Sequence, residues 1–264
     1  MGATDTPEAG EAPVDPDAVW ARLDRVHDPE LDRSIVELQY VEEVDIDGDA
    51  VDVTFVLPTA WCSPAFAWMM ATGIRDEVRS LPGVSEVTVE LPDHMHGEEV
   101  TTGVNQELAF ETVFDDAEDG IEEVQRKLDE KARFARQYDA LRALRDAGLD
   151  PEQIVDLTLA DLDLDFRPET AAVSVRDGTL TVTVPREPLA EYLTKAEATG
   201  LVTGSGDRLF ADRDGDPLDP DPEAFQAAVD DARLAVSNIE GQATICASLH
   251  ESRNDVTLDE FGGA

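Results

Sequence analysis

With 264 residues and enough apolar content for a buried core, the chain can hold one large domain or two modest ones. Its 60 acidic residues against 20 basic ones give a formal net charge of −40, which excludes nucleic acid and anionic lipid as expected partners. The acids are spread along the chain, and this pattern resembles the surface of halophilic proteins that work in strongly screening salt; a site for a basic partner is the alternative.

The N-terminal residues 1–14 are rich in Pro, Gly, Ala and acid, which predicts a disordered acidic tail. They have neither the basic start nor the apolar core of a secretory signal peptide. No apolar run approaches the roughly 18 residues of a membrane-spanning helix, and two cysteines are too few for a disulfide framework. We therefore expect a soluble, cytoplasmic protein.

A helix and a β-hairpin are expected at the start of the folded chain. Asp15 followed by Pro16 is typical of a helix start. This helix should end near His27, because Pro29 disfavours helical backbone at the residue before it. Over residues 41–57 apolar residues alternate with others on both sides of an Asp-Gly turn, and this predicts the hairpin.

A second helix and a third strand follow. Ser63 and Pro64 have the character of a cap and a first helical residue, and the apolar residues after them recur at helical spacing. Alternation over residues 87–91 predicts the strand. The order helix, strand, strand, helix, strand predicts a small α/β (α+β) domain over residues 15–105, which ends in a polar loop from residue 93 on.

The remaining residues, 106–264, are expected to form a mostly helical region with one or two hairpins. Apolar spacings of three and four over residues 118–147 predict one long amphipathic helix, closed by Gly148. The other predicted elements are a short helix opened by Asp150, a hairpin over residues 171–185, and helices over about 187–199 and from about 222 to 251.

Cys62 is one of only two cysteines, and it stands just outside the predicted second helix. The unpaired N–H groups and the positive dipole end of a helix favour a thiolate, which is the form that binds metal or attacks an electrophile. The alternative is a small buried residue, because free Cys is among the most buried residue types. Position alone leaves both interpretations open.

The flanks of Cys62 carry a pattern of motifs in a fixed order. The motifs are Asp28-Pro29-Glu30, residues 34–38, and Thr59 with Cys62. With these motifs and this element order, residues 17–91 resemble the MIP18-like family, also called the domain of unknown function 59 family. The segment departs from the family at two places: Gln39 stands where the family usually has Gly, and Ser63 where it often has Pro.

The resemblance implies an assembly or maturation factor. Members of the family act in iron–sulfur cluster assembly or in maturing metalloenzymes such as phenylacetyl-CoA oxygenase. By resemblance, Cys62 handles a cluster or iron, with zinc as a lesser alternative, for a client metalloenzyme such as an oxygenase or for other assembly factors. Asp28, Glu30 and Thr59 stand at motif positions, where they orient a ligand or only satisfy the loop backbone. An accessory role is favoured over turnover chemistry, and the absence of a P-loop motif sets the chain apart from larger relatives with an ATPase domain.

The two cysteines and four histidines supply a further hypothesis. Cys246 and His250 are four residues apart and share a face if the segment is helical, and His94 and His96 share a face if the third strand continues. Both spacings occur in metal sites, although they also arise by chance. We therefore consider a site in which the C-terminal region folds back onto Cys62. Its candidate ligands are Cys62, Cys246, His94, His96 and His250.

Two other functions stay open at this point. The protein could be a metal-free protein–protein adaptor with a structural Cys62, in which the long helix is the docking surface or the interface of a homodimer. Alternatively, it could be a thiol enzyme with Cys62 as nucleophile, and such an enzyme needs a positioned base. His27 is the nearest candidate base in the sequence.

Overall fold

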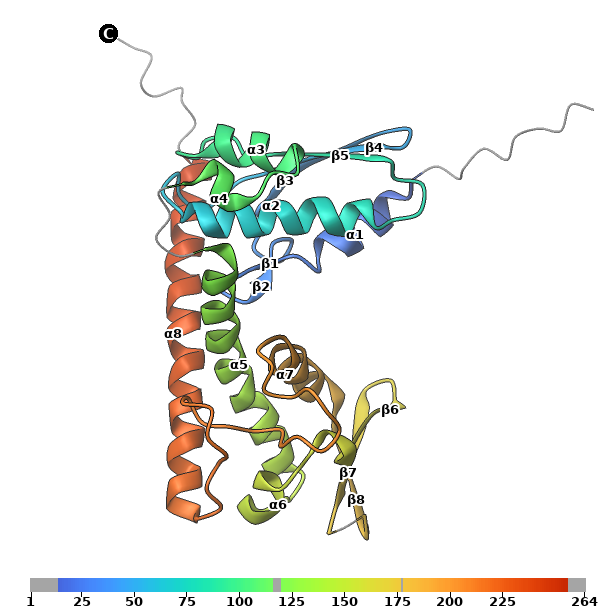
Figure 1. The fold of residues 1–264 in the computed structure, drawn as a ribbon, viewed down its shortest axis with the longest axis vertical. Helices are drawn as coiled ribbons and strands as arrows, with labels where there is room; N and C mark the ends of the chain where they lie inside the picture. Colours follow the sequence, from blue (N-terminus) through green and yellow to red (C-terminus); the bar gives the residue numbers. More distant parts are fainter. Residues whose placement is uncertain (1–13, 116–119, 177, 256–264) are drawn as a thin grey trace, which may run out of the picture. The chain divides into compact units, whose positions relative to one another are not determined.

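A computed structural model describes residues 14–115, 120–176 and 178–255 of the chain (Figure 1). The chain divides into two compact units. Unit 1 takes in the residues up to Ile121 together with those from Ile245 on, and unit 2 is Glu122–Thr244. The predicted α+β class is confirmed by helices and three small sheets. Residues 1–13 of the predicted tail lie outside the described residues.

Unit 1 contains the elements from α1 to α4 and the last turns of α8. These are α1 (Pro16–Leu23), β1 (His27–Asp28), β2 (Arg33–Ser34), β3 (Val41–Asp47), β4 (Ala50–Phe55), α2 (Pro64–Arg79), β5 (Glu86–Glu90), α3 (Gly97–Asn105), α4 (Phe110–Val113) and α8 (Pro222–Asp255). The predicted order of helix, hairpin, helix and strand is therefore present, with β1, β2, α3 and α4 as additions.

The three-stranded sheet of unit 1 has the order β3-β4-β5, with β3 antiparallel and β5 parallel to the central β4. In β4 the side chains of Val51, Val53 and Phe55 are fully buried, whereas Asp52 between them is exposed. This alternation places one face of the strand in the core. Helix α2 packs against β5, α1 and α3 (Figure 1), and its buried Ile74 and Val78 contribute to the same core.

Two predicted boundaries in unit 1 are wrong. Helix α1 ends at Leu23 rather than near His27, because His27 and Asp28 pair with β2 in a short antiparallel ladder. The segment expected to be a polar loop from residue 93 contains helix α3. The helix was missed because its buried residues are only Gly97, Val100, Gly103 and Val104, and two of these four are glycines without an apolar side chain.

The backbone conformation at Gln39 bears on one departure from the family pattern, the replacement of the usual glycine. Its backbone has a φ of 59°, in the left-handed region that glycine adopts without strain. A residue with a Cβ pays about 1–2 kcal/mol there. The family's usual glycine thus fits the backbone conformation that this chain has at Gln39. The next residue enters the hairpin with its N–H bonded to the Ile35 carbonyl at 2.9 Å.

Unit 2 contains the following elements. They are α5 (Ile121–Asp146), α6 (Pro151–Val155), a 3₁₀ turn (Leu159–Asp161), β6 (Leu162–Arg167), β7 (Thr170–Val175), β8 (Leu180–Pro185), α7 (Arg186–Ala198) and most of α8. Helices α5 and α8 run side by side and antiparallel here (Figure 1), since Lys131 bonds Gln242 and Arg145 bonds Gln226, each at 3.0 Å. The predicted long helix, short helix, hairpin and following helix are confirmed; β6 was not predicted as a strand.

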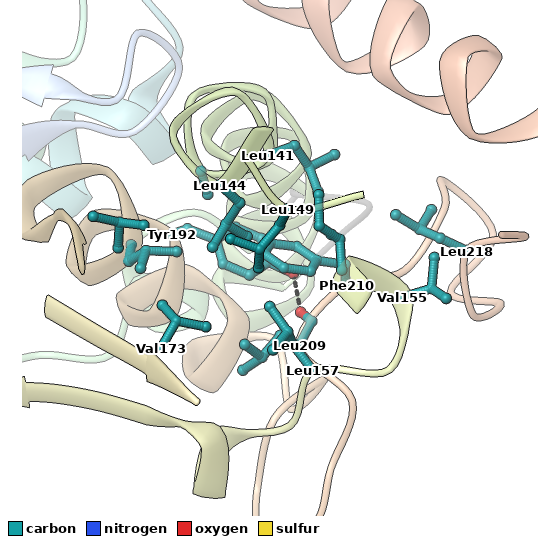
Figure 2. Close-up of a cluster of buried hydrophobic side chains, with 14 of the residues drawn as sticks. Leu141, Leu144, Leu149, Val155, Leu157, Val173, Tyr192, Leu209, Phe210 and Leu218 are labelled. Atoms are coloured by element: carbon teal, nitrogen blue, oxygen red, sulfur yellow. Dashed lines mark hydrogen bonds between the residues drawn. The ribbon is translucent and has the colours of Figure 1, made fainter. Parts of the chain in front are cut away.

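The core of unit 2 joins its helices to its sheet. Leu141 and Leu144 of α5, Val173 of β7 and Tyr192 of α7 converge in one buried cluster (Figure 2). The Tyr192 hydroxyl donates a hydrogen bond to the Leu209 carbonyl, so the polar end of the ring is satisfied inside the cluster. No helix in the described parts of the chain is long and apolar enough to cross a membrane.

Candidate metal-handling site

The loop between β4 and α2 carries Cys62. Thr59 shapes this loop, because its hydroxyl accepts a hydrogen bond from the Trp61 N–H at 3.2 Å and its carbonyl accepts one from the Cys62 N–H at 3.4 Å. The same hydroxyl lies 3.6 Å from the Cys62 sulfur, within hydrogen-bond reach. Thr59 therefore both closes the turn and fixes where the thiol points.

Cys62 stands at the head of α2, as predicted. Ser63 occupies the cap position and Pro64 is the first helical residue, but the Ser63 side chain makes no capping hydrogen bond. The Cys62 thiol is free and half-buried. Next to it Trp61 is 75% exposed, and Met95 of the neighbouring loop is 56% exposed. The thiol is thus reachable from outside, beside two large apolar side chains on the surface.

A second loop, between β5 and α3, lies against the Cys62 loop. The Met95 N–H donates to the Ala60 carbonyl at 2.9 Å, and the His94 Nε2 lies 3.0 Å from the Cys62 carbonyl oxygen. The His96 N–H donates to His94 Nδ1 at 3.2 Å. Since Nδ1 accepts a hydrogen bond, the ring proton is on Nε2, which donates to Cys62. Both nitrogens of His94 are therefore occupied in supporting the loops.

The surroundings of the two histidines differ. Burial lowers the pKa of His94, although its bond to the Cys62 carbonyl opposes the shift. His96 lies edge-on to the Phe114 ring, with the ring centres 5.5 Å apart, and 3.7 Å from the Glu99 carboxylate. Contrary to the prediction, His94 and His96 do not lie on a strand but directly before α3, which begins at Gly97. A Cβ at position 97 would collide with the Leu91 carbonyl oxygen. His94 is thus held neutral, as a support of the Cys62 loop.

Asp28 is the last residue of β1, directly before the β1–β2 turn, and is 8% exposed. Its Oδ1 accepts hydrogen bonds from the N–H groups of Glu30 at 2.8 Å and Leu31 at 3.0 Å. Burial raises the pKa of Asp28, and the two backbone bonds oppose that shift. The buried Tyr40 hydroxyl lies beside this carboxylate but meets hydrogen-bond geometry with no group in the described chain. Asp28 therefore organises the turn through its hydrogen bonds, and its carboxylate is a buried acidic group of the candidate site.

The last turns of α8 return to the same part of unit 1. The His250 ring is buried against Tyr40, with ring centres 5.8 Å apart. Arg253 Nη1 donates to the Leu57 carbonyl at 2.6 Å, and its Nη2 lies 3.1 Å from the Asp93 carboxylate. Arg253 thus ties the end of the helix to the start of both site loops.

Sequence reasoning missed Tyr40 and Arg253. The signal for Arg253 was its place three residues after His250, on the same helical face. Tyr40 gave no comparable signal, because a tyrosine beside a hairpin is an ordinary core residue.

Cys246 lies on α8, four residues before His250. It is a free, half-buried thiol. Burial raises its pKa first of all, and the charges of Asp28, Cys62 and Glu30 add to the shift. The same groups act on Tyr40, whose pKa is raised by burial and then by Asp28, Cys246 and Cys62. The charges of Asp28 and Cys62 therefore act on both the Cys246 thiol and the Tyr40 hydroxyl.

The predicted metal ligands do not close into a complete site. In residues 14–115, 120–176 and 178–255, no group of three or more His, Cys, Asp or Glu side chains is arranged to hold a metal ion. Metal binding by Cys62, Cys246, His94, His96 and His250 therefore stays a prediction. The candidate base His27 lies 3.8 Å from the Asp32 carboxylate, in the β1–β2 turn.

The comparison with known proteins covers the first part of the chain. The model of a family described as iron-sulfur cluster assembly protein matches residues 16–91. This segment is a MIP18-like domain. A relative is the iron-sulfur cluster carrier protein of Synechocystis sp., 39% identical over 75 residues, which are 28% of this chain and 21% of that protein. The chain thus matches about a fifth of the length of this curated relative.

Only part of the candidate site lies inside the matched segment, residues 16–91. Cys62, Thr59, Asp28 and Glu30 lie inside the MIP18-like domain. The His94/His96 loop and the α8 residues lie beyond residue 91, outside the matched segment. The site therefore combines motif positions of the family with side chains supplied by the rest of this chain.

Proposed function

We propose that this protein assembles or carries an iron–sulfur cluster, or delivers iron, with Cys62 as the residue that binds the cargo. One observation carries the proposal: the Cys62 thiol, inside the segment that matches a cluster-assembly family, is held by Thr59 at a reachable position on the surface. A thiolate is the protein ligand that iron–sulfur clusters use. Zinc, which also binds thiolates, is the lesser alternative cargo.

The family-motif neighbours would support the thiol. The Thr59 hydroxyl, 3.6 Å from the sulfur, can donate a hydrogen bond to a thiolate and so stabilise its charge. Asp28 and Glu30 lie on the same side of the domain and supply negative charge that attracts a cation. Such charges favour entry of iron without completing a closed coordination sphere.

The partner would be a client metalloenzyme, for which an oxygenase is one candidate, or another assembly factor. The exposed Trp61 and Met95 beside the thiol provide apolar surface that such a partner could cover while it receives the cargo. The proposal extends to the setting: a cytoplasmic protein whose acidic surface is suited to high salt, with a homodimer as an alternative assembly. Nucleic acid and membranes are not expected partners.

Anaerobic reconstitution tests the proposal. The full chain is incubated with ferrous iron and sulfide, and cluster formation is followed by visible absorption and by transfer to an apo-ferredoxin. We expect the wild type to form and transfer a cluster, and Cys62→Ser to lose about 10-fold or more in bound iron. Ser63→Ala is the matched control, because that side chain makes no capping bond and its loss should change neither quantity.

The adaptor alternative predicts the opposite result for metal content and for Cys62→Ser. If the anaerobically isolated protein holds no metal, and Cys62→Ser takes up iron and transfers it as the wild type does, Cys62 is structural and the proposal fails. A retained interaction of such a metal-free protein with its client would then favour the adaptor. Rapid alkylation of Cys62 that depends on His27 would instead favour a thiol enzyme.

A further inference from the structure

The C-terminal turns of α8 present three polar side chains to the MIP18-like domain. Cys246, His250 and Arg253 stand at positions i, i+4 and i+7, which share one face of a helix. Two of the three have contacts that fix this face: His250 packs on Tyr40, and Arg253 bonds the Leu57 carbonyl. The face that carries Cys246 is therefore turned toward the domain and not toward solvent.

The contacts also set the position of Cys246 along the axis of α8, relative to the residues of the site. With a rise of about 1.5 Å per residue, Cys246 lies about 6 Å before His250 and about 10 Å before Arg253 along the helix. Arg253 is level with the start of the Cys62 loop and with Asp93. His250 is level with Tyr40, which is next to the Asp28 turn. The helix thus brings Cys246 past the Asp28–Tyr40 side of the site, where burial raises the pKa of its thiol and the charges of Asp28, Cys62 and Glu30 add to the shift.

We propose that Cys62 and Cys246 form a two-thiolate site for a thiophilic metal ion or cluster, with one ligand from the MIP18-like domain and one from the C-terminal helix. This inference rests on the proposed function, because it takes Cys62 as the cargo ligand. It adds a residue that lies 155 positions beyond the end of the matched segment at residue 91. The family motif does not contain this ligand.

A site with two protein thiolates suits transfer. Structural zinc sites fill all four positions with protein ligands, whereas catalytic zinc sites keep a position open for water or substrate. Here the two open positions are available to a donor before loading and to a client afterwards. Arg253 holds the helix that carries Cys246 in place through two loops at once, so the second thiol is positioned before the cargo arrives.

Cadmium binding tests the site independently of cluster chemistry. Cd²⁺ is titrated into the full chain under anaerobic conditions, and the thiolate-to-metal absorption band and the affinity are recorded. We expect the wild type to give about twice the band intensity per metal of either Cys62→Ser or Cys246→Ser. The second thiol raises the effective ligand concentration, so each single variant should bind about 100-fold more weakly or worse.

A swapped variant controls for thiol number and for folding. Cys246→Ser combined with Ser248→Cys keeps two thiols in the chain, but residue 248 is exposed, about 200° around the helix from residue 246. This variant should bind Cd²⁺ as weakly as Cys246→Ser, with an unchanged circular dichroism spectrum. Wild-type affinity in the swapped variant, or in Cys246→Ser, overturns the two-thiolate site.

The two proposals fail separately. If Cys62→Ser loses cluster transfer while Cys246→Ser binds Cd²⁺ as the wild type does, only the two-thiolate site falls. If both single variants weaken Cd²⁺ binding but Cys62→Ser still forms and transfers a cluster, the two-thiolate site stands and the proposed function falls.

Discussion

The two units differ in the chemistry that they hold. All six Cys and His side chains of the chain lie in unit 1, and residues 122–244 of unit 2 contain neither type. Two of the six, Cys246 and His250, join unit 1 only because the chain returns to it from Ile245 on. Soft metal ligands are therefore confined to the unit that contains the MIP18-like domain, and the return of α8 adds to them.

The two units also differ in how their buried charged side chains are paired. In unit 2 the buried Arg133 is paired with Glu130 at 3.0 Å, and the buried Asp129 with Lys195 at 2.7 Å. In unit 1 the buried Asp28 has no basic side chain as an ion-pair partner in the described chain. A charge that is buried without an ion pair costs stability, and proteins keep such groups mainly where they serve a site. Unit 2 thus pairs these buried charges with side chains, whereas unit 1 holds Asp28 by hydrogen bonds from the backbone N–H groups of Glu30 and Leu31.

The largest expected effect tests whether the units are separate in stability. Leu141→Ala removes a fully buried side chain from the unit 2 core (Figure 2) and should lower the free energy of unfolding by about 2–5 kcal/mol. Denaturant unfolding followed by far-ultraviolet circular dichroism measures it. Because all three tryptophans, Trp20, Trp61 and Trp68, lie in unit 1, the transition seen by tryptophan fluorescence should shift less.

Leu234→Ala is the matched control for this core substitution. Leu234 also lies on a helix of unit 2 but is 55% exposed, so its truncation should cost well under 1 kcal/mol. Equal shifts of the circular dichroism and fluorescence transitions in Leu141→Ala would mean that the two units unfold as one. In that case the contrast in chemistry would not extend to stability.

The sequence predicts the fold well where the local signals agree. The hairpin of β3 and β4 has alternation and an Asp-Gly turn, and α5 has long apolar periodicity, so both are where they were expected. Helix α3 was missed because its inner face is short and includes Gly103, which packs against Trp68 and gives no hydrophobic signal. The ladder of β1 and β2 has two residues per strand and leaves no periodicity to detect.

The site was predictable only in part, for a physical reason. Cys62 and Thr59 could be found because three residues apart at a helix start they form a local pattern. The position of Cys246 depends on which part of the chain the end of α8 packs against, about 180 residues after Cys62, and a spacing of four in one helix does not predict that packing. Tyr40 and Arg253 became visible as site residues only through their contacts with His250 and with the two loops.

A smaller effect concerns the backbone of unit 1 alone. Gln39→Gly should raise the free energy of unfolding by about 0.5–1 kcal/mol, because the left-handed conformation no longer strains a Cβ. The gain is partly offset by the greater freedom of glycine in the unfolded chain. Tryptophan fluorescence, which reports on unit 1, is the measurement. Gln39→Ala keeps the Cβ in the same conformation and should show no such gain; an equal gain would point to the lost side chain and not to the backbone.

The smallest effect is the pH dependence of stability that comes from a histidine, a residue type that unit 2 lacks. The lowered pKa of His94 means that the unfolded chain, where the pKa is about 6.5, takes up a proton before the folded one does. The stability due to His94 is therefore complete above about pH 6.5 and is lost as the pH falls toward the folded pKa. We expect the wild type to lose stability relative to His94→Gln over that interval.

His94→Gln is suited to this comparison, because the glutamine amide can still donate to the Cys62 carbonyl that His94 Nε2 contacts at 3.0 Å. The titrating group is removed while the bond between the two loops is kept, and His27 and His250 are unchanged in both proteins; His96, whose charge acts on His94, is the one coupled histidine. The difference in unfolding free energy, measured by tryptophan fluorescence at several pH values from about 7.5 downward, isolates His94. A constant difference across this range would mean that His94 is not held neutral against the Cys62 loop. Its nitrogens would then have to be reconsidered as metal ligands, and the chemistry of unit 1 would extend beyond the two thiols.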